Sequence, residues 1–135
     1  MVEINNKTRS KIDIKRIETA VNKFFVHYKV KEKQVSIALV GDKTIRELNK
    51  KYRGIDRPTD ILTFSGEEDF LGEIVIDLAQ VKRQAKTYSK TTADELNFIL
   101  VHGMLHLLGY DDKTEKDRLR MLTLGEKFIK TNIKK

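Results

Sequence analysis

Two of the chain's three histidines, His102 and His106, stand four residues apart. At that spacing two side chains project from the same face of a helix about one turn apart, so both imidazoles can bind one metal ion. The chain has no cysteine, and any strong metal site must therefore use nitrogen and oxygen ligands. The pair predicts a metal-binding helix, with hydrogen-bonded core histidines as the alternative.

Position 103, between the two histidines, is glycine. The helical zinc signature of metallopeptidases has its general base, a glutamate, directly after the first histidine. Peptide hydrolysis by that mechanism is therefore not expected. Because glycine inside a helix costs about 1 kcal/mol relative to alanine, we expect Gly103 to serve close packing or to leave room for a ligand.

A carboxylate at Asp112 follows His106 by six residues, after a helix stop at Gly109. A turn there can bring Asp112 back to the histidines as a third ligand. Two imidazoles and one carboxylate, with a fourth position open to water, match the ligand count of a catalytic zinc site. The alternative is a helix cap, since Glu115 lies three residues further on.

The elements that must position these residues follow from hydrophobic spacing. The stretch 93–108 is apolar on almost every side, which is typical of a buried helix. Asp42 is expected to cap another helix. The order of elements predicts an α+β domain: a mixed β-sheet of about four strands covered by helices, with the metal-binding helix buried in the core. Strands are expected near 2–5, 35–40, 60–64 and 73–77, and helices over 12–25, 42–52, 78–88, 93–108 and from 113.

The bulk numbers describe one domain over residues 1–135 with a formal net charge of +7. No apolar run is long enough to span a membrane, and the N-terminus lacks the hydrophobic stretch of a secretory signal, so a cytoplasmic location is expected. A basic protein is biased toward polyanions such as RNA, although charge spread over a surface is weak evidence.

Three blocks of sequence resemble the YbeY family of rRNA-maturation endoribonucleases. Residues 102–112 resemble the family signature, 52–64 resemble its arginine-bearing loop and following strand, and 71–76 resemble its next strand. The blocks come in the family's order, and the likeness extends over most of the chain. It implies an α+β fold and a zinc-dependent, single-strand-specific endoribonuclease acting in 16S rRNA 3′-end maturation and ribosome quality control. The implied partners are rRNA, the ribosome and ribosomal proteins, with no membrane.

The resemblance assigns roles residue by residue. His102 and His106 match the first two metal ligands, and Asp112 falls where the third ligand is ordinarily histidine. One Zn²⁺ per chain is expected, and a harder divalent ion such as Mn²⁺ stays open because the third ligand is a carboxylate. Arg53 matches the arginine near the metal cleft. It is expected to bind the substrate phosphate and to act in catalysis, since its planar fork suits a phosphate.

Several alternatives remain. Arg53 could instead pair with Asp56 at a helix end. Glu73 and Asp111 are candidates for the general base on residue type alone. A non-catalytic ribosome-assembly factor, binding rRNA and carrying a structural metal site, is the second hypothesis for function, and a peptidase is a distant third.

Overall fold

The computed structural model describes residues 1–133, and the elements follow the order that the sequence pattern predicts. They are β1 (Val2–Asn6), α1 (Ile14–His27), β2 (Gln34–Val40), α2 (Asp42–Arg53), β3 (Ile61–Ser65), β4 (Phe70–Asp77), α3 (Leu78–Thr87), α4 (Thr92–Leu107) and α5 (Glu115–Asn132).

The four strands form one mixed sheet in the order β1-β2-β4-β3. Strand β2 pairs in parallel with both β1 and β4, whereas β3 pairs with β4 in antiparallel fashion. The predicted α+β fold with a mixed four-stranded sheet is confirmed. Strand β3 lies at the edge of the sheet, so within residues 1–133 its outer side is not paired with another strand.

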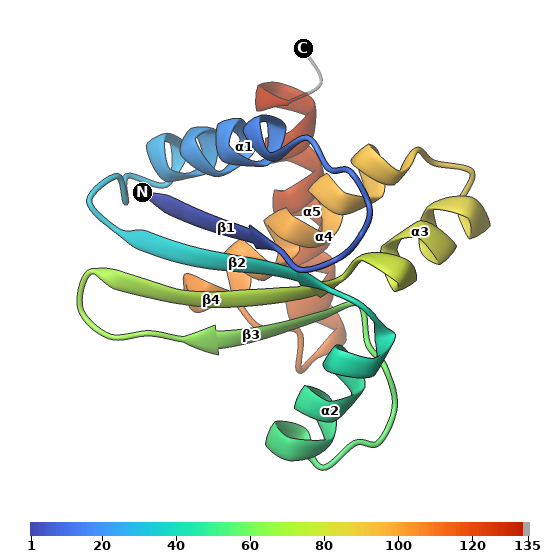
Figure 1. The fold of residues 1–135 in the computed structure, drawn as a ribbon. Helices are drawn as coiled ribbons and strands as arrows, with labels where there is room; N and C mark the ends of the chain where they lie inside the picture. Colours follow the sequence, from blue (N-terminus) through green and yellow to red (C-terminus); the bar gives the residue numbers. More distant parts are fainter. Residues whose placement is uncertain (134–135) are drawn as a thin grey trace.

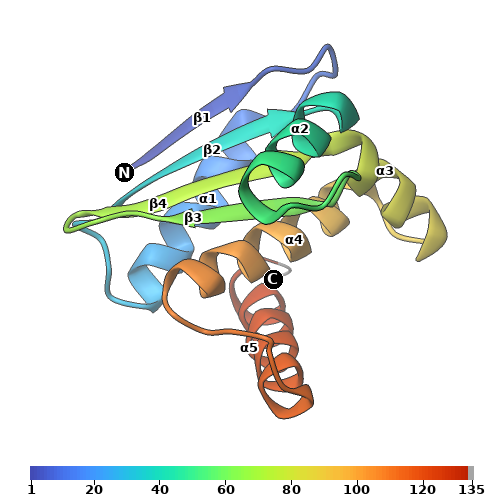
Figure 2. The same cartoon turned by 90° about the horizontal axis from the view of Figure 1, so that it is seen from below.

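Helices α1 and α4 lie on one face of the sheet and α2 on the other (Figures 1 and 2), so the sheet separates a large core from a small one. Successive side chains of a strand point to opposite faces. On β4, Ile74 and Ile76 belong to the large core, which α1 and α4 cover, while Val75 packs in the small core with Ile45 of α2. Helix α2 therefore lies on the opposite face of the sheet from α4.

Helix α4 is buried, as its apolar sequence predicts. It packs against β3, β4, α1, α3 and α5, and Leu100, Met104 and Leu105 are fully enclosed. The Thr91 side chain caps its start by accepting a hydrogen bond from the Asp94 N–H (3.1 Å). The chain leaves the helix through Gly109, whose φ of 104° favours glycine. Within residues 1–133, no helix is both long and apolar enough to cross a membrane.

The predicted capping role of Asp42 is wrong. Helix α2 begins at Asp42 itself, and Gly41 occupies the N-cap without a side-chain bond. The Asp42 carboxylate instead accepts two hydrogen bonds from the Arg83 guanidinium of α3, at 2.8 and 3.0 Å. A tertiary ion pair has thus replaced the local bond that the sequence suggested.

Candidate metal centre

The histidine pair lies on one face of α4, where that face meets solvent. The ring centroids of His102 and His106 are 4.9 Å apart, and both side chains are half-buried. The Nε2 atoms lie 3.8 Å and 3.6 Å from Oδ2 of Asp112, respectively. Both rings therefore present the same nitrogen to one carboxylate oxygen.

The loop after α4 brings Asp112 into place. The Tyr110 N–H donates to the Leu105 carbonyl (3.1 Å), which folds the chain back along the end of the helix. Helix α5 is capped by Thr114, whose hydroxyl accepts from the Asp117 N–H (3.0 Å). The alternative that Asp112 caps this helix is therefore wrong, and its carboxylate faces the histidines instead.

The three side chains could hold a metal ion. One ligand atom from each of His102, His106 and Asp112 lies within 4.8 Å of the others. Tetrahedral coordination at zinc–ligand distances near 2.1 Å sets ligand atoms about 3.4 Å apart. The two separations between histidine nitrogens and Asp112, 3.6 and 3.8 Å, would need to close by only a few tenths of an ångström, and all three ligand atoms lie within 4.8 Å of one another. The donor set and the spacing both fit a divalent ion.

The electrostatics keep His102 ready to act as a ligand. Burial lowers its pKa, and the neighbouring His106 lowers it further, while Asp112 and Asp60 act in the opposite direction. A lowered pKa favours the neutral imidazole, which is the form that binds a metal.

Gly103 lets α4 approach β3 closely. A Cβ at this position would lie 2.6 Å from Cδ1 of Ile61 and 3.4 Å from Cγ2 of Thr63. Of the two explanations that the sequence left open, close packing is the observed one.

The candidate ligands open into a cleft of about 770 Å³. The cleft is lined from both faces of β3, by Ile61 and Thr63 on the α4 side and by Leu62 and Phe64 on the α2 side, so it runs over the open edge of the sheet. The other lining residues are Tyr52, Arg53, Thr59, Asp60, Phe98, Ile99, His102, His106, Asp112 and Leu122.

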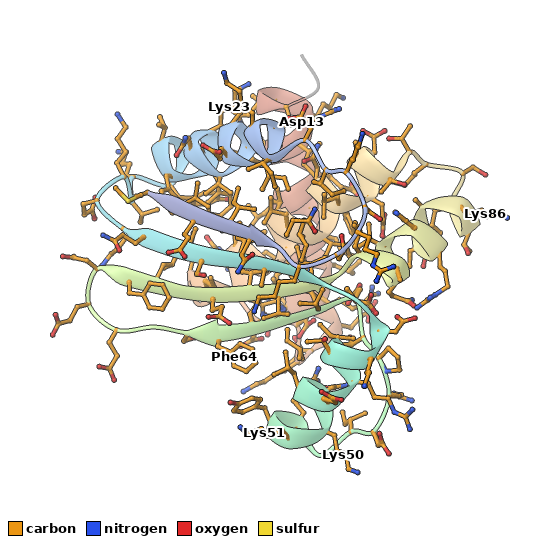
Figure 3. The ribbon with its side chains drawn as sticks, viewed as in Figure 1. Asp13, Lys23, Lys50, Lys51, Phe64 and Lys86 are labelled. Atoms are coloured by element: carbon orange, nitrogen blue, oxygen red, sulfur yellow. The ribbon has the colours of Figure 1, made fainter. Side chains whose placement is uncertain are left out.

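Arg53 lies in this cleft as the last residue of α2. Its side chain makes no hydrogen bond or ion pair within the described part of the chain, and Asp56 pairs with Arg46 instead (2.8 Å). The alternative pairing of Arg53 with Asp56 is therefore wrong. Figure 3 labels Lys50 and Lys51 near this end of α2 and Phe64 on β3. The neighbours of Arg53 in the cleft lining are aromatic, since Tyr52 and Phe64 both line the cleft with their ring centroids 5.2 Å apart.

The two carboxylates considered as general bases lie elsewhere. Glu73 shares the α2 face of β4 with Val75, away from the histidines, and neither Glu73 nor Asp111 lines the cleft. Asp60 does line it, and sequence reasoning gave this residue no role. The signal was present, since Asp60 stands directly before β3 inside the arginine-bearing block.

Comparison with known proteins gives a consistent result. Residues 3–132 match the family described as endoribonuclease YbeY. The endoribonuclease YbeY of Acholeplasma laidlawii is 38% identical over 99% of this chain and 100% of that protein. The one from Heliobacterium modesticaldum is 41% identical over 78% of this chain and 73% of its own length.

A solved structure shares the fold. The solution structure of a Thermotoga maritima protein superposes with a TM-score of 0.71 at 33% identity, covering 96% of this chain and 87% of the other. The sheet, the histidine helix and the sequence relatives lead to one assignment: the chain belongs to the endoribonuclease YbeY family.

Proposed function

We propose that this protein is a metal-dependent endoribonuclease that cleaves single-stranded RNA, acting with the ribosome in the cytoplasm in the maturation of the 16S rRNA 3′ end and in ribosome quality control. The observation that carries the proposal is one cleft that brings together three potential metal ligands and Arg53, which has no partner among residues 1–133. The names of the relatives support the choice of RNA as the substrate. Residues 1–135 act as a single domain in this proposal.

The proposed cofactor is one Zn²⁺ per chain, held by His102, His106 and Asp112. The two imidazoles favour zinc, and a carboxylate is a competent third ligand. The same carboxylate makes the site more tolerant of a harder ion such as Mn²⁺ than three imidazoles would be. A divalent ion held by these three side chains would supply Lewis acidity to a phosphate oxygen.

The protein's own residues bind and orient the RNA. Arg53 donates two parallel N–H groups to the non-bridging oxygens of the scissile phosphate and opposes the charge that builds up in the transition state. Its lack of a partner among residues 1–133 leaves the whole guanidinium available. Tyr52 and Phe98 offer aromatic surface in the same cleft, and such surface stacks on unpaired bases. Base stacking of this kind is accessible in single strands and not in duplexes.

Metal analysis of the purified protein tests the proposal first. We expect about one zinc per chain, lost in His106→Ala and in Asp112→Ala. The zinc-loaded protein should cleave a single-stranded RNA and leave a duplex of the same sequence intact, and a chelator should stop the cleavage. Metal bound without any RNA cleavage would instead favour the assembly-factor hypothesis, in which the site is structural. If Asp112→Ala bound as much zinc as the wild type, Asp112 would not be a ligand of the site.

A further inference from the structure

A charged side chain that the proposed reaction does not use is buried on the helix that carries both histidines. Glu95 lies in the first turn of α4 and is 1% exposed. Burying a carboxylate is costly unless both oxygens find partners. Oε1 accepts from Nζ of Lys90 at 2.8 Å, and Oε2 accepts from Nε2 of Gln84 at 2.9 Å. Glu95 is thus fully engaged by two residues from outside its own helix.

Gln84 connects Glu95 with the cleft. Nε2 of Gln84 also lies 3.4 Å from Oδ2 of Asp60, and Oε1 of Gln84 accepts from Gln80 at 3.0 Å. The amide is therefore held at both ends and joins two carboxylates. The Asp60 backbone is fixed as well, because its carbonyl accepts from the Asp77 N–H at 2.9 Å. Asp60 lines the cleft together with His102.

Lys90 connects Glu95 with the same histidine by another route. Nζ of Lys90 lies 4.7 Å from the ring centroid of Phe98. The Phe98 ring is in turn stacked on the His102 ring, with an interplanar angle of 26° and centroids 6.5 Å apart. Two chains of contacts thus run from one buried carboxylate to residues around His102.

We propose that Glu95 is a positioning residue of the metal centre, which holds Gln84 and Lys90 and through them fixes Asp60 and Phe98 beside His102. This inference rests on the proposed function, because it assumes that His102 binds a metal. Outer partners of a metal-bound histidine set its tautomer and ring orientation. Since Nε2 of His102 faces Asp112, the other ring nitrogen is left for such a partner. Among residues 1–133, Asp60 and Asp112 are the only carboxylates that line the cleft, so Asp60 is the candidate for that partner.

Two variants test the network. Gln84→Met keeps the length of the side chain and every charge but removes the bridge to Asp60, and Glu95→Gln removes the buried charge. Each is expected to raise the zinc dissociation constant of the folded protein about 10-fold, measured by competition with a chromophoric chelator. Asn6→Ala is the control, because it removes the hydrogen bonds of the turn after β1 and lowers stability at the edge of the sheet opposite β3. It should leave zinc affinity unchanged.

A second measurement needs no metal. In the zinc-free protein, ¹H–¹⁵N spectra of the imidazoles report which nitrogen of His102 carries the proton. We expect a single tautomer in the wild type and a mixture in Gln84→Met. Zinc affinity and His102 spectra that both match the wild type would overturn the proposal and leave Glu95 a purely structural role. If the wild type bound no zinc, the proposed metal centre would fail, and the His102 spectra would still decide this inference. If Glu95→Gln did not fold, Gln84→Met would decide it.

Discussion

The proposed role of Arg53 depends on its having no hydrogen-bond or ion-pair partner among residues 1–133. This residue ends α2 in the cleft, while Arg46 on the same helix is tied to Asp56. We expect Arg53→Ala to lower the rate of RNA cleavage by about 10²–10³-fold, because one donor to a developing charge is worth that much. Zinc content should not change. The cleavage rate of Arg53→Lys should fall between those of the wild type and Arg53→Ala, since lysine carries charge without the planar fork.

Arg46→Ala is the matched control for this prediction. It removes the same charge from the same helix but touches no residue of the cleft. Cleavage by Arg46→Ala should stay within a factor of two or so of the wild type, given that exposed charges of this kind act weakly. An equal loss of rate in both variants would mean that the net charge of α2, and not a contact from Arg53, supports the reaction.

Asp112 and Thr114 separate metal binding from helix capping. Thr114→Ala should lower the free energy of unfolding by about 1 kcal/mol whether or not zinc is present, because the Asp117 N–H loses its acceptor. Asp112→Ala should change the stability of the zinc-free protein little, and should reduce the stabilisation that added zinc provides. Urea denaturation with zinc and with chelator measures both effects. If the two variants lost the same free energy of unfolding in chelator, Asp112 would be a capping residue of α5 and not a metal ligand.

How far the site could be predicted differs among its residues. The histidine pair follows from helical spacing alone, because residues four apart share a face. Asp112 could be placed only by resemblance, since the spacing also fitted a cap and the turn after Gly109 decides between the two. Asp60 was missed because its relation to His102 is made by the fold, across more than forty residues of chain.

At the scale of elements, two helix glycines at the contacts of α4 have different surroundings. A Cβ at Gly103 would press on Ile61 at 2.6 Å, whereas one at Gly125 of α5 would meet Val101 and Leu105 of α4 at 3.7 and 3.9 Å. The first contact forces a side chain to move, and the second is ordinary van der Waals contact. The two helices therefore provide a matched pair of positions.

Both alanine variants gain helix propensity, but only one avoids strain. Gly125→Ala should raise the free energy of unfolding by about 0.5–1 kcal/mol. Gly103→Ala should gain little or lose stability, because displacing Ile61 from its rotamer costs about 0.5–1.5 kcal/mol. Chemical denaturation of the two variants beside the wild type measures the difference. Equal stabilisation at both positions would show that α4 and β3 do not need the close approach at Gly103.

The elements themselves were predictable where periodicity was strong and less so at their ends. The buried α4 and the strands β2 and β4 follow from long apolar patterns. The start of α2 was misjudged because Asp42 finds Arg83, a partner 41 residues away that no local pattern reveals. The last helix begins at Glu115, two residues later than expected, because Thr114 is the residue that caps it.

At the scale of the whole molecule, the strand order was beyond the sequence pattern. A mixed sheet could be expected from the order of the elements, but the placement of β4 between β2 and β3 depends on long-range pairing. That order brings the ends of β2 and β4 together, since Val40 pairs with Asp77. Asp42 follows β2 at the same edge, so the sheet topology places two carboxyl groups side by side.

The pKa values of these two carboxyl groups are shifted in opposite directions. Burial raises the pKa of Asp77 to about 7, and its hydrogen bond with Asp42 adds to the shift, while the Gln80 and Ala79 N–H groups oppose it. The hydrogen bond from Arg83 lowers the pKa of Asp42 to about 2. Oδ2 of Asp77 is buried and finds no donor within the described chain. A proton on the pair would satisfy that oxygen, so we expect native Asp77 to hold, between about pH 4 and 7, a proton that the unfolded chain has released.

This retained proton makes stability depend on pH. Between about pH 4, where an unfolded aspartate ionises, and pH 7, the native state binds more protons, so the free energy of unfolding falls as pH rises, by at most about 1.4 kcal/mol per pH unit. Asp77→Asn should abolish this decline, because an amide supplies the proton permanently and still caps α3. Urea denaturation of both zinc-free proteins at pH 5, 6 and 7 isolates the effect, since the histidines contribute equally to each. Parallel pH profiles would show that Asp77 is ionised in the native protein. Two neighbouring carboxylates, Asp42 and Asp77, would then repel each other and weaken the junction of β2, β4 and α3.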